Sequence, residues 1–208
     1  MTYFDCAPGY WDFRGMERLG PALAPYRDSV FLACKTGQRG AKEAQEELDR
    51  SLKLMQTDHF DLYQLHGMSS MEDYDKAMAP GGAMEVLRAA KAAGVVKNIG
   101  FSAHHEECAC ALIATGEFDS ILTAFNFVSW TEGGFGQDMM AAAKSHKMAV
   151  LGIKSLARCR YTRGEDKAYS SCWYAPEEDP EYQERLYTYS LSLGVSVCVS
   201  PVRADTAA

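Results

Sequence analysis

Short apolar runs alternate with longer segments of helical periodicity along almost the whole 208-residue chain. One run and one helical segment recur together about every 30 residues, which is the length of a strand–helix unit. Repeated units of this kind predict parallel strands that are joined by right-handed crossovers. The alternation therefore predicts an α/β protein.

Seven of the apolar runs have the length and composition of strands. They lie at residues 2–7, 30–35, 60–66, 97–102, 120–127, 148–153 and 195–200. Segments with helical spacing or capping signals separate them, near residues 15–24, 41–55, 82–93, 105–115 and 136–146, and a last helix opens at Asp179 and Pro180. The polar stretch 68–80 is predicted to be a loop.

Two α/β folds compete for this pattern. An open, doubly wound sheet normally holds its ligand at one switch point and uses few strand ends. Here polar residues lie at the C-terminal ends of several successive strands. This pattern favours a (β/α)8 TIM-type barrel with its site at the C-terminal face. With seven strands the barrel is incomplete, and we expect its first strand and last helix to be missing. Residues 1–208 are expected to form a single domain.

The composition excludes several classes of partner. The net charge of −7 disfavours nucleic acid and anionic membranes as partners. No run is long enough to span a membrane, and the N-terminus lacks a signal region. The seven cysteines are odd in number and lack the spacing of a zinc site. We therefore expect a cytoplasmic protein without a structural metal.

Polar side chains follow three successive strand candidates. The first run ends on Asp5 and breaks into a Pro-Gly turn that carries Tyr10, and later runs end on Lys35 and His66. Each residue alone has an ordinary reading, as a turn residue, a solvated lysine or a structural histidine. Because the C-terminal ends of parallel strands meet at one edge, we expect the four side chains to lie together.

These segments resemble the aldo-keto reductase family, and the resemblance covers essentially the whole chain. It rests on Phe4-Asp5-Cys6-Ala7 with Tyr10, Cys34-Lys35, the segment 58–66 and Ile99-Gly100-Phe101-Ser102, and the region around Cys172-Trp173-Tyr174 is similar to a bacterial branch. The resemblance implies a TIM barrel, truncated at both ends, that reduces a small aldehyde or ketone with NADPH or NADH.

The chemistry of carbonyl reduction accounts for the four residues. Hydride delivery leaves an alkoxide that needs a proton, which Tyr10 would donate. A lysine ammonium about 4 Å away stabilises a phenolate by roughly 4 kcal/mol at an effective dielectric of 20, so Lys35 is expected to lower the pKa of Tyr10. Asp5 would keep Lys35 charged, and His66 would bind the carbonyl oxygen.

The resemblance also implies a cofactor site. Ser102 and Asn126 end two further strands where the family holds the nicotinamide carboxamide. Ile153 or Lys154 falls where many relatives stack an aromatic side chain on nicotinamide, and Lys154 would meet a pyrophosphate or solvent. The last stretch, 200–203, lacks the glycine of the family's phosphate loop.

Two other functions remain open. A truncated relative could be a catalytically weak or inactive binding or regulatory protein, since the phosphate loop is incomplete. A metal-dependent barrel hydrolase using Asp5, His66 and His104 is a distant third possibility. The sequence does not indicate the substrate or the oligomeric state.

Overall fold

The computed structural model describes residues 2–162, 164, 167 and 174–199 and divides into two compact units. Unit 1 comprises residues 1–121 and unit 2 residues 122–208. The elements that begin in unit 1 are β1 (Thr2–Asp5), α1 (Arg14–Leu23), the 3-10 helix η1 (Ala24–Ser29), β2 (Val30–Thr36), α2 (Ala41–Met55), β3 (Phe60–Met68), α3 (Met71–Met78), α4 (Ala83–Ala92), β4 (Val96–Ala103), α5 (Glu106–Ala114) and β5 (Ser120–Thr123).

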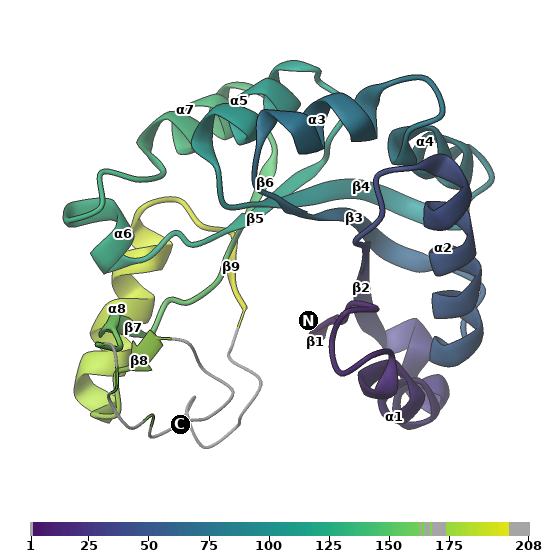
Figure 1. Ribbon diagram of the computed structural model, residues 1–208. Helices are drawn as coiled ribbons and strands as arrows, with labels where there is room; N and C mark the ends of the chain where they lie inside the picture. Colours follow the sequence, from purple (N-terminus) through teal and green to yellow (C-terminus); the bar gives the residue numbers. More distant parts are fainter. Residues whose placement is uncertain (1, 163, 165–166, 168–173, 200–208) are drawn as a thin grey trace. The chain divides into compact units, whose positions relative to one another are not determined.

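The strands of unit 1 are parallel and follow one another in chain order, β1-β2-β3-β4. The register pairs Asp5 with Ala33 and Lys35 with Gln64. The helices of this unit lie along one face of the strands (Figure 1). Side chains on the other face come from every second residue, because Cβ atoms alternate along a strand.

Local sequence explains these elements. In α2, Ala44, Leu48 and Met55 are buried at helical spacing, and the helix covers the predicted residues 41–55. Gly94 follows α4 with a φ of 76°, a left-handed conformation that glycine adopts without strain. Both predictions are confirmed.

The predicted loop over residues 68–80 is wrong in its centre, because α3 occupies Met71–Met78. Ser70 caps this helix by accepting a hydrogen bond from the Asp73 backbone N–H at 3.1 Å. Acidic residues in the first turn then favour the helix dipole. The high polarity that suggested a loop belongs to a short solvated helix.

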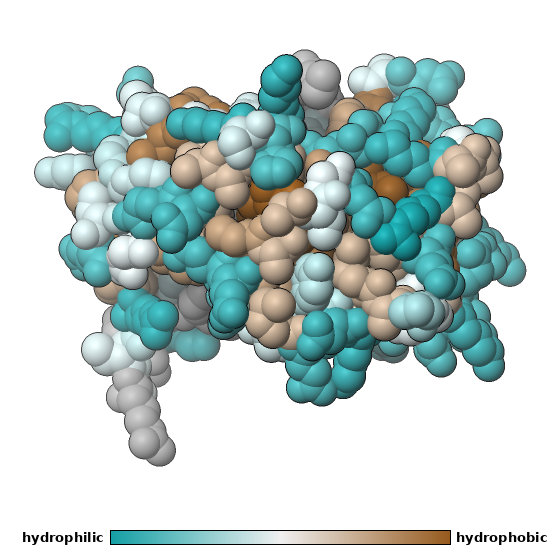
Figure 2. Space-filling view, turned by 90° about the horizontal axis from the view of Figure 1, so that it is seen from above, coloured by the Kyte–Doolittle hydropathy of each residue, from teal (hydrophilic) through white to brown (hydrophobic). Residues whose placement is uncertain are grey.

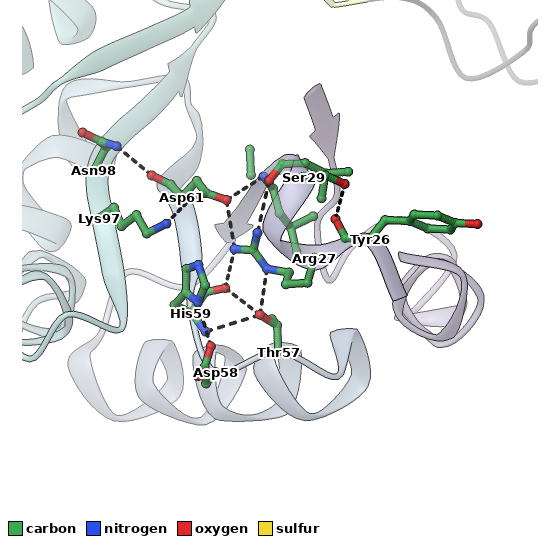
Figure 3. Close-up of polar contacts among 12 residues, drawn as sticks. Tyr26, Arg27, Ser29, Thr57, Asp58, His59, Asp61, Lys97 and Asn98 are labelled. Atoms are coloured by element: carbon green, nitrogen blue, oxygen red, sulfur yellow. Dashed lines mark hydrogen bonds and ion pairs between the residues drawn. The ribbon is translucent and has the colours of Figure 1, made fainter. Parts of the chain in front are cut away.

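A group of polar residues ties the amino-terminal ends of the strands together (Figure 3). We call it the base cluster; its members are Arg27, Thr57, His59, Asp61 and Lys97. Asp61 accepts from the Leu32 backbone N–H at 2.9 Å and pairs with Arg27 at 2.9 Å and Lys97 at 2.8 Å. Arg27 also donates to the Thr57 hydroxyl at 2.8 Å and to the His59 carbonyl at 2.9 Å.

Burial alone would raise the pKa of Asp61. The Leu32 N–H and the two cations outweigh burial and hold the pKa below its ordinary value. In barrel folds this end of the strands serves stability rather than chemistry.

Unit 2 contains the end of β5 and the remaining described elements. These are α6 (Phe127–Thr131), α7 (Gln137–Ser145), β6 (Ala149–Gly152), β7 (Ala157–Arg160), β8 (Tyr174–Pro176), α8 (Pro180–Ser192) and β9 (Val197–Cys198). β6 and β9 are parallel, whereas β7 and β8 form a separate antiparallel pair. Asp179 caps α8 by accepting from the Glu181 N–H at 2.9 Å, as the sequence predicts.

All seven expected strands exist among the described residues, but four of them are shorter than predicted. The run 148–153 yields β6 only over Ala149–Gly152. The run 120–127 yields a strand only over Ser120–Thr123, because Asn126 begins helix α6 as its N-cap. The run 195–200 yields the two-residue β9, and β1 ends at Asp5 rather than at residue 7. The predicted phosphate stretch 200–203 lies outside the described residues.

On the face over α3 and α5, apolar residues gather in the middle and hydrophilic residues lie around them (Figure 2). No helix in the described part of the chain is sufficiently long and apolar to cross a membrane.

Candidate active site

Three strands of unit 1 bring the predicted catalytic residues together. Asp5 ends β1, Lys35 lies near the end of β2, and His66 lies near the end of β3. Since register partners and residues two apart share a face of the sheet, these three side chains project to the same side. Tyr10 joins them from the loop after β1. We call Asp5, Tyr10, Lys35 and His66 the strand-end cluster.

Direct contacts link the members of this cluster. Lys35 Nζ forms an ion pair with Asp5 Oδ1 and lies 3.4 Å from the Tyr10 hydroxyl. The Tyr10 ring meets the His66 ring edge-on, with centroids 5.7 Å apart and planes at 90°. The predicted grouping is therefore present in the structure.

Two residues that sequence reasoning missed hold the Asp5 carboxylate. Asp5 Oδ2 accepts from the Tyr3 hydroxyl at 3.0 Å and from Gln64 Nε2 at 3.4 Å. Tyr3 lies two residues before Asp5, and Gln64 lies two residues before His66. The alternation of side chains along a strand could have found both.

Lys35 is completely buried, and this burial governs its charge. Desolvation lowers the pKa of the Lys35 ammonium to about 7. The adjacent Asp5 carboxylate stabilises the charged form and opposes this effect. Lys35 is therefore poised to change its protonation state near neutral pH.

Tyr10 is 43% exposed, the most accessible member of the cluster. Its pKa is raised, first by burial of part of the ring and then by the nearby thiols of Cys6 and Cys34. This direction is opposite to the one expected from Lys35. The expectation assumed a full ammonium charge, which a lysine with a pKa of about 7 does not carry at neutral pH.

His66 is neutral at physiological pH. Burial, together with the positive charges of Lys35 and Arg39 and the nearby His104, lowers its pKa to about 4. A neutral imidazole still has one N–H to donate, so His66 can bind an oxygen atom without protonating it.

Ser102 lies at the end of β4, where the sequence places a cofactor-binding hydroxyl. It is 3% exposed, and its Oγ accepts from the Gly67 backbone N–H at 2.8 Å. The hydroxyl hydrogen is left for a second partner.

The other predicted cofactor residues belong to unit 2. Asn126 Oδ1 caps α6 by accepting from the Ser129 N–H at 2.9 Å and from the Ser129 hydroxyl at 2.9 Å. Ile153 and Lys154 directly follow β6, and both are partly buried. Lys154 adopts a φ of 60°, which turns the chain sharply after the strand.

The metal hydrolase hypothesis needs a cluster of ligands. Among the residues that the structure describes, no group of three or more His, Cys, Asp and Glu side chains is placed to hold a metal ion.

Comparisons with known proteins place the chain in a family. The model of the aldo/keto reductase family matches residues 1–186. The chain belongs to the aldo/keto reductase family. Aldo-keto reductase YhdN of Bacillus subtilis (strain 168) is 30% identical in an alignment of 208 positions. The alignment covers 92% of this chain and 59% of the relative.

A second relative from the same organism, an uncharacterized oxidoreductase named YqkF, is 26% identical over 170 residues and is covered to 52%. The chain thus spans between about half and three fifths of the length of these curated relatives.

Solved structures of aldo-keto reductases share the fold. The holo form of AKR11C1 from Bacillus halodurans superposes with a TM-score of 0.72 at 22% identity, covering 95% of this chain and 71% of that one. A Klebsiella pneumoniae aldo-keto reductase in complex with NADPH gives 0.63 at 23% identity, covering 75% and 53%. The predicted α/β class and TIM-barrel type are confirmed.

Proposed function

We propose that the chain is an oxidoreductase that reduces an aldehyde or ketone to an alcohol, with Tyr10 as the proton donor. The contact of Lys35 with both the Asp5 carboxylate and the Tyr10 hydroxyl carries this proposal. Through this contact, the charge of the buried Asp5–Lys35 ion pair acts on the proton of the accessible Tyr10 hydroxyl. His66 adds a second hydrogen-bond donor beside Tyr10.

The protonation states fit these roles at neutral pH. Tyr10 keeps its proton because its pKa is raised, so it can give that proton to the alkoxide oxygen. The phenolate that remains lies beside Lys35 Nζ. This negative charge favours the ammonium form of Lys35, which then stabilises the phenolate.

The residues present also fit a nicotinamide cofactor, which supplies the hydride when it is bound. Ser102 retains a hydroxyl hydrogen, and Asn126 retains its amide NH2 group, so each can donate to a carboxamide oxygen. Ile153 would pack against the ring, and Lys154 would attract the pyrophosphate. We expect NADPH, the cofactor in the Klebsiella pneumoniae structure, with NADH as the alternative.

We further propose that both units belong to one barrel-type domain, because the family match runs across them. The substrate would be a small carbonyl compound. The setting would be the cytoplasm, on the ground of the cysteine pattern; none of the six described cysteines forms a disulfide.

The test follows NADPH absorbance during incubation of the purified protein with a panel of aliphatic and aromatic aldehydes and ketones. The wild-type chain is expected to consume NADPH, and Tyr10→Phe is expected to lose this activity while still binding the cofactor. The alternative, a binding or regulatory protein, predicts NADPH binding in a fluorescence titration without turnover of any substrate. Absence of turnover with every substrate would overturn the proposal.

A further inference from the structure

The strand β3 contains a bulge at the point where it presents His66. Leu65 pairs with Phe101 of β4, and the next pair joins Met68 to Ala103, so β3 has one residue more than its partner. His66 and Gly67 together lie opposite Ser102. Bulges redirect side chains and leave backbone groups without ladder partners.

Side chains from outside β3 satisfy the backbone groups of this bulge. The Gly67 N–H donates to Ser102 Oγ at 2.8 Å. Arg39 Nη2 donates to the His66 carbonyl at 2.9 Å and to the Gly67 carbonyl at 3.3 Å. Gly67 adopts a φ of 65°, so the bulge depends on a conformation that other residues rarely adopt.

The guanidinium of Arg39 is itself held in place. Its Nε pairs with Asp73 Oδ1 at 2.9 Å, and its Nη1 donates to the Gly37 carbonyl at 3.1 Å. Asp73 Oδ2 accepts from the Ser69 N–H and hydroxyl, both at 3.0 Å. Both partners of the ion pair are largely buried, with side-chain exposures of 17% and 23%.

We infer that Arg39 is a positioning residue of the proposed reductase: by binding both carbonyls of the bulge, it fixes the direction in which His66 faces Tyr10. The inference rests on the proposed function. It explains why a loop arginine donates to both carbonyls of the bulge, while its bonds to Asp73 and Gly37 hold the guanidinium in place. A lysine carries the same charge but lacks the planar fork that reaches several acceptors at once.

The charges around His66 are Lys35 from β2, Arg39 from the loop after β2 and His104 from the end of β4, and the Tyr10 hydroxyl faces it from the loop after β1. Removal of Arg39 takes away one positive charge and loosens the bulge. The pKa of His66, about 4 in the intact chain, should then rise.

The experiment compares Arg39→Met and Arg39→Lys with the matched control Arg88→Met. Arg88 lies on α4 and donates to Glu117 at 2.8 Å, so its loss removes an equal charge from another arginine–carboxylate pair. His66 is titrated by NMR, with its signals assigned from His66→Gln, and kcat and KM are measured with an aldehyde that the wild type reduces.

Arg39→Met is expected to raise the pKa of His66 by about 0.5 to 1 and to lower kcat about 10- to 100-fold. The KM for NADPH should change less than about twofold. Arg39→Lys should keep the pKa of His66 low while kcat still falls. A kcat in Arg39→Lys that matches that of Arg88→Met would overturn the inference, even if Arg39→Met does not fold.

The NMR arm separates this inference from the proposed function. If the wild type reduces no carbonyl compound, the proposed function fails, whereas the response of His66 to Arg39→Met still decides whether Arg39 acts on His66.

Discussion

Unit 1 carries a largely buried carboxylate with a cationic partner at each end of its strands. The two clusters differ in the number of cations at the carboxylate and in whether an accessible acid adjoins the ion pair. In the base cluster, Asp61 has two cations and a backbone N–H, and Arg27 has further acceptors. In the strand-end cluster, Asp5 has one cation, Lys35, and two uncharged donors, Tyr3 and Gln64. Lys35 also contacts the Cys6 carbonyl and the accessible Tyr10 hydroxyl. The first arrangement is closed and stabilises the fold, whereas the second leaves a poised acid facing outward.

The largest expected effect tests the strand-end cluster. Tyr10→Phe removes the proposed proton donor, which should lower kcat about 10³-fold. The free energy of unfolding should change little, because the ring packing is retained and the hydroxyl is accessible. Steady-state kinetics and urea denaturation measure the two quantities, and a variant with wild-type kcat would exclude Tyr10 as the donor.

The base cluster should show the opposite behaviour. The double variant Arg27→Met/Asp61→Asn leaves the Val30 and His59 carbonyls without their Arg27 donor, so we expect it to lower the free energy of unfolding by about 3 kcal/mol. Its kcat at a temperature where it remains folded should equal that of the wild type. A loss of kcat without loss of stability would contradict this division of roles.

The pH dependence of stability separates the two clusters further. The unfolded state binds more protons than the folded state between pH 6.5 and about 4, because the pKa of His66 is lowered over that interval. Stability should therefore fall as pH drops through this window, by about 2 kcal/mol for a partly buried histidine.

His66→Gln supplies the control and should lack this loss. The pKa of Asp61 is held below its ordinary 3.8, so the base cluster weakens only in more acidic solution. Identical unfolding curves for the wild type and His66→Gln between pH 4 and 6.5 would show that His66 is not buried as a neutral ring.

The smallest expected effect concerns the ion pair itself. Asp5→Asn/Lys35→Met removes both buried charges of the strand-end cluster together, and buried pairs replaced in this way are often neutral for stability. The free energy of unfolding should change by less than about 1 kcal/mol, although activity should disappear. A loss comparable to that of the base-cluster variant would show that both pairs serve the fold.

Sequence predicted the grouping of the strand-end cluster because the relevant rule is geometric. Asp5, Lys35 and His66 each end an apolar run, and parallel strands bring such ends to one edge. The direction of the Tyr10 pKa could not be predicted in the same way. It depends on how much charge Lys35 retains after burial, and burial depth is a property of the folded structure.

Arg39 shows a second limit of sequence reasoning. It lies in a loop, where basic residues are ordinarily solvated, and its acceptors are backbone carbonyls that no side-chain pattern reveals. Gly67, directly after His66, was the available signal, since a glycine within a strand often marks a bulge. Helix α3 was not predicted because the high polarity of residues 68–80 is typical of a loop. The N-cap Ser70, which begins the helix, was overlooked.

The four-residue strand β1 has one consequence for the lifetime of the assembled site. Among the described strands it pairs with β2 alone. Short segments joined on one side open locally at a lower free energy than the whole molecule, and hydrogen exchange reports such openings. Each opening of β1 would withdraw Asp5 from Lys35 and carry Tyr10 away with it. The fraction of molecules competent for proton transfer at any moment is therefore set by the local opening equilibrium of β1, and amide exchange at Phe4 and Asp5 would measure it.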